Sequence, residues 1–180
     1  MSVKTRLLEA GVTLLKTRGF AALTQPQVAA QAGVKQSHLT YYFPTRTDLL
    51  IAIAEYTVDS LLVQAAAQLT QAPNGKTLQE LILHVMLEGV PPRVIVGLIA
   101  AADSDPAIRL SLDRLICHAR QAMPMLLQVA GLRAGTEDVL LFHATMVGLA
   151  IMHQARLNDE SAADLRSGLE RLIQCLTPSV

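Results

Sequence analysis

Aromatic residues are scarce in this sequence, and the few that occur are unevenly placed. The 180 residues include three Tyr, three Phe and no Trp. Half of these six stand side by side at Tyr41, Tyr42 and Phe43, and Pro44 follows directly. This cluster lies among the few basic residues of the first third of the chain, which raises the question of what the three aromatic side chains do there.

Cysteine is equally rare, which excludes the small disulfide-stapled and zinc-knuckle classes. Cys117 and Cys175 are too few and too far apart for a disulfide framework or a metal site, and this pattern favours a reducing cytoplasm. We expect both thiols to be buried as small apolar side chains.

Long uninterrupted apolar runs are also missing, although 51% of the residues are hydrophobic and only 17% are charged. The longest apolar or small run, residues 94–102, is far below the roughly 18 residues that a spanning helix needs. The first twenty residues interleave basic side chains with leucines, unlike a signal peptide. We therefore expect no membrane association, and the excess apolar surface indicates a subunit interface or an apolar ligand.

The residue patterns of enzymes and metal sites are absent too. The sequence has no glycine-rich phosphate loop, no Ser or Cys in a nucleophile setting and no plausible pair of catalytic carboxylates. His143 and His153 are ten residues apart on different helix faces, and no Asp or Cys completes a metal cluster. We expect no enzyme activity, no catalytic residue, no cofactor and no metal.

Charge is balanced overall but divided along the chain. Residues 1–50 hold six basic and two acidic side chains, a net charge of +4, whereas the remainder holds nine basic and thirteen acidic ones, a net charge of −4. This asymmetry indicates that the N-terminal segment faces a polyanion, although a solvated basic face would give the same count.

Apolar spacing is helical along nearly the whole chain, and no stretch alternates as a strand would. Capping residues, glycines and prolines divide this pattern, with the Thr24/Gln27 and Thr45/Asp48 pairs at capping-box spacing. We predict an all-α fold of about nine helices. Their approximate ranges are 3–18, 24–33, 35–43, 46–70, 77–88, a short helix ending near 102, 107–130 with a kink before Pro124, 137–157 and 160–176.

Two short helices meeting at a glycine form a helix-turn-helix pattern. Counted from Gln25, Ala29 is the small residue that lets the helix axes approach closely, and Gly33 accepts the positive φ of a tight turn. Leu39 stands where an apolar side chain pins the second helix to the first. The motif lies in the basic N-terminal segment, which favours DNA as the polyanion.

The stretch TRGFAALTQPQVAAQAGVKQSHLTYYFPTRTDLL resembles the DNA-binding domain of the TetR/AcrR family of bacterial transcription regulators. The likeness covers roughly residues 3–50 in a fixed order of helix, Gly-Phe, Thr cap, Ala-Gly-Val turn, Leu, Tyr-Phe, Pro and capped fourth helix. It implies a three-helix DNA-binding domain at residues 1–45 and a helical effector-binding and dimerisation domain at residues 46–180.

The resemblance also implies which residues meet DNA. Base edges would face the front of the second motif helix, and phosphates would meet polar residues around it. The base-reading set is Lys35, Gln36, Ser37 and His38, and the phosphate-binding set is Thr24, Thr40, Tyr41, Tyr42 and Arg46. The family commonly has Ser or Thr at position 35 and Tyr at position 40, so Lys35 and Thr40 are departures. We expect Phe43 to be core.

The second layer of function is expected in the C-terminal part. The helix at 137–157 is apolar nearly all round, which predicts a homodimer through the last two helices, as the family resemblance also implies. Met, Phe and His side chains of the middle helices fall at spacings suited to an apolar effector pocket. That predicted pocket set is His84, Met86, His118, Met123, Phe142 and Met146.

Together these patterns predict a cytoplasmic, nucleoid-associated homodimer that binds double-stranded DNA at a palindromic operator. We expect a transcriptional repressor that a small, largely apolar effector releases from that operator. The alternative is a protein-interaction module retaining a degenerate helix-turn-helix, which Thr40 and the modest charge of +4 support.

Overall fold

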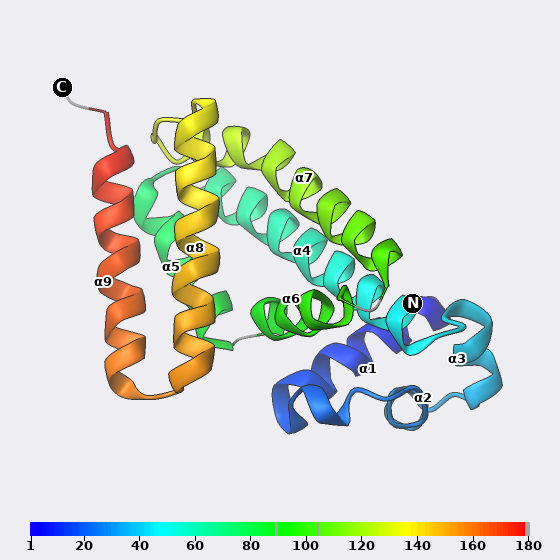
Figure 1. Ribbon diagram of the computed structural model, residues 1–180. Coiled ribbons are helices and arrows are strands. Elements are labelled where there is room, and N and C mark those ends of the chain that lie inside the picture. The colour runs from blue at the N-terminus through cyan, green and yellow to red at the C-terminus, as the bar shows by residue number, and fades with distance from the viewer. Residues whose placement is uncertain (89, 104, 179–180) are drawn as a thin grey trace. The chain divides into compact units, whose positions relative to one another are not determined.

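The computed structural model describes residues 1–88, 90–103 and 105–178, with the side chains of residues 88, 90 and 91 not described. Within these ranges the chain forms nine α-helices and one short 3-10 helix and contains no strand, so the predicted all-α fold is confirmed (Figure 1). The helices are α1 Val3–Arg18, η1 Phe20–Ala22, α2 Gln25–Ala32, α3 Gln36–Tyr42, α4 Arg46–Gln71, α5 Gly75–Glu88, α6 Val90–Ala101, α7 Pro106–Val129, α8 Thr136–Arg156 and α9 Asp159–Leu176.

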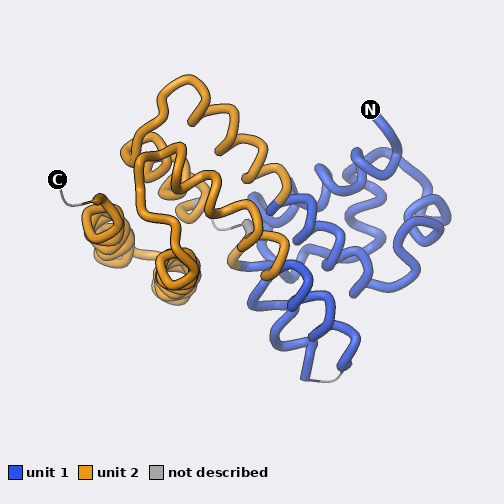
Figure 2. Tube along the Cα trace, turned by 90° about the horizontal axis from the view of Figure 1, so that it is seen from above, with its two compact units in different colours: residues 1–58, 93–115 blue, residues 59–92, 116–180 orange. Residues whose placement is uncertain are grey.

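The chain divides into two compact units, which Figure 2 colours separately. Unit 1 comprises residues 1–58 and 93–115, and unit 2 comprises residues 59–92 and 116–180. Helices α4 and α7 therefore contribute residues to both units. The predicted functional division at residues 45 and 46 concerns roles rather than contacts, and it stays a prediction.

Most helix ends lie within two residues of their predicted positions because local capping residues set them. Asp105 accepts a hydrogen bond from the backbone N–H of Ala107 at 2.9 Å, and Pro106 is the first residue of α7. Helix α5 begins at Gly75, two residues earlier than predicted, because Asn74 caps it through the N–H of Thr77 at 2.9 Å. The predicted break at Gly89 lies outside the described residues.

Unit 2 is organised around α8, α9 and α5, whose packing buries the apolar stripe of α9. Its members are Leu165, Leu169, Leu172, Ile173 and Leu176. Gly168 allows α9 to approach α8 closely, since a Cβ there would stand 2.8 Å from the side chain of Leu149.

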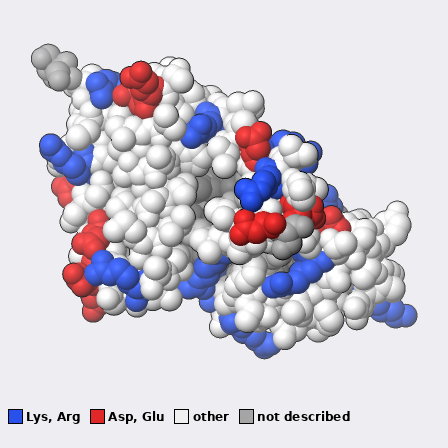
Figure 3. Space-filling model, in the orientation of Figure 1, with Lys and Arg blue, Asp and Glu red and all other residues white. Residues whose placement is uncertain are grey.

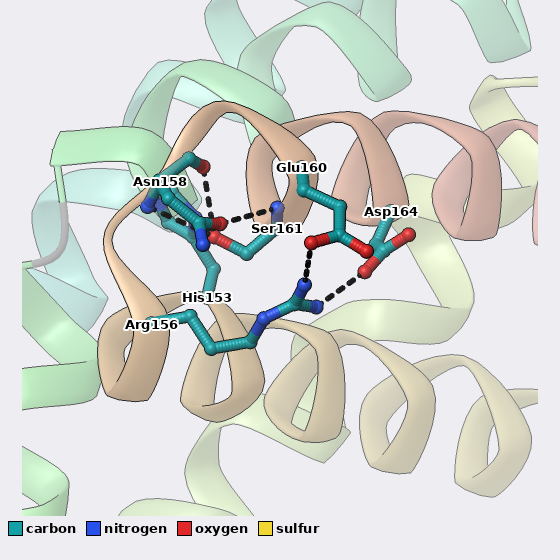
Figure 4. Close-up of polar contacts among 6 residues, drawn as sticks. All are labelled: His153, Arg156, Asn158, Glu160, Ser161 and Asp164. Atoms are coloured by element: carbon teal, nitrogen blue, oxygen red, sulfur yellow. Dashed lines mark hydrogen bonds and ion pairs between the residues drawn. The ribbon is translucent and has the colours of Figure 1, made fainter.

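Polar contacts fix the turn between α8 and α9. Buried His153 and Ser161 share a 2.9 Å hydrogen bond there. Arg156 pairs with Glu160 and Asp164 (Figure 4).

One expectation from composition is wrong. Both cysteines are exposed rather than buried. Helices α4 and α8 have the length and apolar composition to cross a membrane, with mean hydropathy of 1.5 and 1.2 over their most apolar windows. No unbroken apolar run marks these helices in the sequence, because single charged or polar residues interrupt each of them without lowering its mean hydropathy much.

Candidate nucleic-acid interface

The helix-turn-helix of unit 1 is built from locally specified ends. The hydroxyl of Thr24 accepts a hydrogen bond from the N–H of Gln27 at 3.4 Å, and Pro26 lies in the first turn of α2. Gly33 ends α2 in the left-handed region, with φ of 65° and ψ of 38°, as the turn requires. The predicted cap and turn are therefore present where the sequence places them.

Helix α3 is held by a few apolar anchors. Leu39 is fully buried and Phe43, directly after the helix, is 2% exposed, so the expectation that Phe43 is core is confirmed. At seven residues α3 is too short to be stable alone, so these anchors keep it folded against α1 and α2. Lys35 occupies the N-cap position without a side-chain hydrogen bond to the helix. That lack follows from chemistry, because a Lys ammonium cannot accept the N–H bonds that Ser or Thr would.

The outward face of α3 carries the predicted base-reading residues. Gln36, Ser37 and His38 are all exposed at the first turn, together with Lys35. These four side chains offer amide, hydroxyl, imidazole and ammonium groups within four consecutive positions. Such groups form the hydrogen bonds that distinguish bases in the major groove.

The two tyrosines extend this polar face. Tyr41 is 81% exposed and Tyr42 41% exposed, and their rings meet edge to face with centroids 5.2 Å apart. The ring of Tyr42 also lies 6.4 Å from that of Phe43. The exposure of these three rings therefore decreases along the chain, from Tyr41 at the surface through Tyr42 to Phe43 in the core.

Two predicted phosphate-binding residues have hydroxyl groups already engaged. Thr40 is half-buried, and its hydroxyl donates within α3 to the carbonyls of Gln36 at 3.3 Å and Ser37 at 3.2 Å. Thr24 differs, because its hydroxyl oxygen accepts from Gln27 and keeps its proton for a phosphate. Thr24 is therefore the better donor of the two.

Three polar side chains, two of which sequence reasoning missed, tie the elements of this region together. The guanidinium of Arg6 donates to the carbonyl of Ala32 at 2.6 Å, at the C-terminal end of α2. The amide of Gln25 donates to the carbonyl of Phe43 at 2.7 Å. Arg46, a predicted phosphate contact, donates from Nε to the carbonyl of Leu23 at 3.1 Å. None of these bonds leaves a local signal, since each joins residues 18 to 26 positions apart.

Helix α6 also packs onto this region within unit 1. Gly97 faces the ring of Phe20 so closely that a Cβ at this position would collide with it. Arg93 donates to the carbonyl of Leu15, near the end of α1, at 3.2 Å. The guanidinium of Arg46 also lies over the ring of Phe20 in a cation–π contact, with Cζ 5.1 Å from the ring centroid.

The six residues of the predicted effector pocket all belong to unit 2 but differ in exposure. Met86, Met123 and Phe142 are buried, Met146 is half-buried, and His84 and His118 are exposed. His118 lies 2.7 Å from a carboxylate oxygen of Asp59 at the surface. The pocket stays a prediction.

One titratable group of unit 2 is perturbed by its surroundings. Burial, and secondarily the positive charge of Arg120, lower the pKa of His143 below its ordinary value. Nδ1 of that imidazole accepts a hydrogen bond from Nε of Arg120 at 3.3 Å. This bond requires a lone pair, so it too favours the neutral ring. Among the described residues, no three His, Cys, Asp or Glu side chains are grouped so that they could hold a metal ion.

Comparison with known proteins extends these observations. Residues 7–53 match the family model described as bacterial regulatory proteins, tetR family. The HTH-type transcriptional regulator CymR of Pseudomonas putida is 27% identical over 120 residues, which cover 64% of this chain and 59% of CymR. The chain thus matches about three fifths of the length of that curated relative.

Two solved structures illustrate the shared fold. A TetR transcription regulator from Haloarcula marismortui has a TM-score of 0.69 at 15% identity, covering 98% of each chain. The multidrug binding protein EbrR, solved in complex with ethidium, has a TM-score of 0.64 at 18% identity, covering 99% of this chain and all of EbrR. The family model on the helix-turn-helix and the fold shared over the full length together support a TetR-family transcriptional regulator.

Proposed function

We propose that this chain is a homodimeric transcriptional repressor that binds a palindromic operator and leaves it when a small, largely apolar effector binds. The observation that carries the proposal is the outer face of α3, where Gln36, Ser37 and His38 are exposed on a helix anchored by Leu39 and Phe43. A rigidly seated helix with a polar outer face is what major-groove reading requires.

The contacts with DNA divide into two kinds in this proposal. Base edges face Lys35, Gln36, Ser37 and His38, where the Gln amide suits adenine and the Lys ammonium suits guanine. The phosphates meet a ring of donors around α3. Its members are Thr24, Thr40, Tyr41, Tyr42 and Arg46. Thr40 contributes least, because its hydroxyl proton already serves carbonyls of its own helix.

Dimerisation is supported by the surface of α8. Leu140, Leu141, Val147 and Met152 are between 39% and 55% exposed, although the helix buries its other side within unit 2. Figure 3 shows few charged side chains over the face on which α8 lies. A second copy that covers this face through α8 and α9 removes the apolar surface from water. The same pairing accounts for the hydropathy of α8 without a membrane.

Effector release completes the proposed mechanism. Buried Met86, Met123 and Phe142 supply the apolar side chains of a pocket in unit 2, and EbrR offers a precedent of the same fold holding ethidium. Because α4 contributes to both units, an effector that shifts it moves the two α3 helices out of register with the operator. The protein acts in the cytoplasm at the nucleoid.

The test is selection of duplexes from a random DNA library by the wild-type chain, followed by binding measurements across a salt series. We expect enrichment of a sequence with two-fold symmetry, and affinity that falls by about 0.9 log units per log unit of salt for each neutralised phosphate. Enrichment of no sequence would refute the regulator and leave the protein-interaction module as the better account.

Release by an effector is tested separately. Apolar compounds are screened for those that raise the melting temperature of the protein, since a ligand that binds only the folded chain stabilises it. A compound that binds in this way is then added to the complex with the selected duplex. If saturation leaves the duplex affinity unchanged for every such compound, the release mechanism is wrong.

A further inference from the structure

The two ends of the helix-turn-helix are joined to each other by side chain to backbone hydrogen bonds. Gln25, the first residue of α2, bonds to the carbonyls of Phe43 and Pro44, which connect α3 to α4. In return Arg46, the first residue of α4, bonds to the carbonyl of Leu23, just before α2. We call this reciprocal set, Leu23, Gln25, Phe43, Pro44 and Arg46, the clasp.

The amide of Gln25 binds one carbonyl at the C-cap of α3 and one in the segment just after it. The last four carbonyls of an α-helix have no partner within the helix, and the end of α3 carries no basic residue in its last turn. Gln25 Nε2 lies 2.7 Å from the carbonyl oxygen of Phe43 and 3.3 Å from that of Pro44. Both partners are acceptors, so only the amide nitrogen of Gln25 fits this place.

Arg46 closes the clasp from the other side. Its Nε donates to Leu23 at 3.1 Å, and its guanidinium lies over the ring of Phe20. Two independent contacts therefore fix the side chain against the segment that precedes α2. An ammonium in place of the guanidinium would keep the positive charge but lose the planar group that makes both contacts.

We infer that Gln25 and Arg46 are positioning residues that set the direction of α3, and that DNA selectivity depends on them although Gln25 itself touches no base. The inference rests on the proposed DNA-binding function. A seven-residue helix has little rigidity of its own, and base reading tolerates errors of only about 0.5 Å in the placement of the reading groups. Releasing the carbonyls at its C-terminal end lets α3 rotate on its apolar anchors.

The main test replaces Gln25 with Met, which has nearly the same length and shape and no donor. The matched control is Gln31→Met, the same change at an exposed position of the same helix. Binding is measured to the duplex that the wild type selects and to an unselected duplex, each across a salt series. For Gln25→Met we expect about tenfold weaker binding to the selected duplex, unchanged binding to the unselected duplex and an unchanged salt slope.

These readouts separate a positioning role from the two simpler roles. Partial unfolding lowers the affinity for both duplexes by the same factor, and a melting curve detects it directly. Loss of a cationic phosphate contact also lowers both affinities and reduces the salt slope by about 0.9. Of these three roles, only a misdirected reading helix lowers the ratio of selected to unselected binding at constant slope.

Arg46→Lys provides the second arm of the test. A positioning role predicts that this variant lowers the ratio while the slope stays at the wild-type value, because the charge is kept. If the variant keeps the wild-type ratio, Arg46 serves phosphate alone and its part of the inference is wrong. Should Gln25→Met fold poorly, Gln25→Leu is measured instead, since its side chain cannot donate and adds no charge.

The outcomes for the inference and for the proposed function are distinct. A wild-type chain that selects no sequence contradicts the proposed function itself. If the wild-type chain selects a sequence and the Gln25 variants keep the wild-type ratio of selected to unselected binding, the positioning role of the clasp is wrong. The proposed function as a regulator is then unaffected.

Discussion

Two uncovered surfaces of the molecule, the outer face of α3 and the outer face of α8, have opposite chemistry. The face of α3 presents an amide, a hydroxyl, an imidazole and the two tyrosine rings, with Tyr41 81% exposed. The face of α8 presents Leu140 at 49%, Leu141 at 50% and Met152 at 55% exposure. Each helix buries its opposite side in its own unit. The side chains that a packed helix leaves exposed thus indicate which class of partner its outer face would bind.

The two helices also differ in how they are held. Helix α8 has 21 residues, and its interior face packs along α9 with Gly168 admitting a close approach. Helix α3 has seven residues and depends on Leu39, Phe43 and the clasp. A single substitution should therefore misdirect α3 more easily than α8, whereas α8 should respond mainly to loss of the second copy that we propose covers it.

The largest effect is expected from placing charge on the α8 face. The double substitution Leu140→Glu and Leu141→Glu puts carboxylates on exposed positions, so the single chain should still fold. Burying them in a dimer is costly, so sedimentation should show a monomer. Because the two halves of a palindrome are then bound separately, affinity for the selected duplex should fall by about 100-fold or more.

The control for this change is Gln64→Glu, an exposed position on α4 in the same unit. It adds negative charge without touching the apolar face and should leave both the oligomeric state and the DNA affinity unchanged. A double variant that remains a full-affinity dimer would show that the α8 face does not form the interface.

The second-largest effect is expected from a substitution of Gln36 on the predicted base-reading face of α3. Removing its amide with Gln36→Ala should relax preference at one base pair and its symmetry mate, losing about 1 to 3 kcal/mol of discrimination there. Binding to duplexes carrying each substitution at that position measures this directly. An equal loss on every sequence would mean that Gln36 does not read a base.

Tyr42→Phe tests the edge of the same face. The ring is retained and only the hydroxyl is lost, so packing against Tyr41 and Phe43 should persist. We expect roughly threefold weaker binding to selected and unselected duplexes alike, as for one neutral hydrogen bond to phosphate. The salt slope should not change, because the hydroxyl carries no charge. A change confined to one sequence would place Tyr42 on a base instead.

These two faces were unequally readable from the sequence. Thr24, Gly33 and the Thr45/Asp48 box predicted the helix ends because each acts on neighbours within three or four residues. Gln25 gave no signal, because its partners are 18 and 19 residues away and become neighbours only after folding. The burial of Cys117 and Cys175 was predicted wrongly, since residue type is a weak guide where a helix face lacks cover.

The apolar periodicity of α8 predicted a buried helix, and the structure covers only one side of it. The sequence predicts that the apolar surface of α8 is buried but does not identify what buries it, because the burying surface can belong to the same chain, another copy or a ligand. For the same reason, the spacing of Met, Phe and His residues did not determine which of them line the effector pocket. Met86 and Met123 are buried and His84 is exposed, although all three were assigned to one cavity.

The smallest expected effect concerns the pH dependence of unit 2, at His143. Its pKa is lowered by burial and by Arg120, so on acidification the unfolded chain takes up a proton at this residue before the folded chain does. The free energy of unfolding should therefore fall as the pH drops from about 6.5 towards the lowered pKa of the folded state. His143→Asn keeps an acceptor for Arg120 and removes the titration. Wild type should lose more stability than this variant between pH 7.5 and 5.5 in urea unfolding.

Arg120→Gln separates the two causes of that shift. It removes the positive charge that disfavours the imidazolium and leaves the burial of His143, so the pH dependence should shrink without vanishing. Because desolvation is the larger cause, most of the difference between wild type and His143→Asn should survive in the Arg120→Gln background. If the pH dependence is instead the same with and without His143, the ring is hydrated in the folded protein. The α8 side of the comparison would then lack the dry interior that its apolar residues imply.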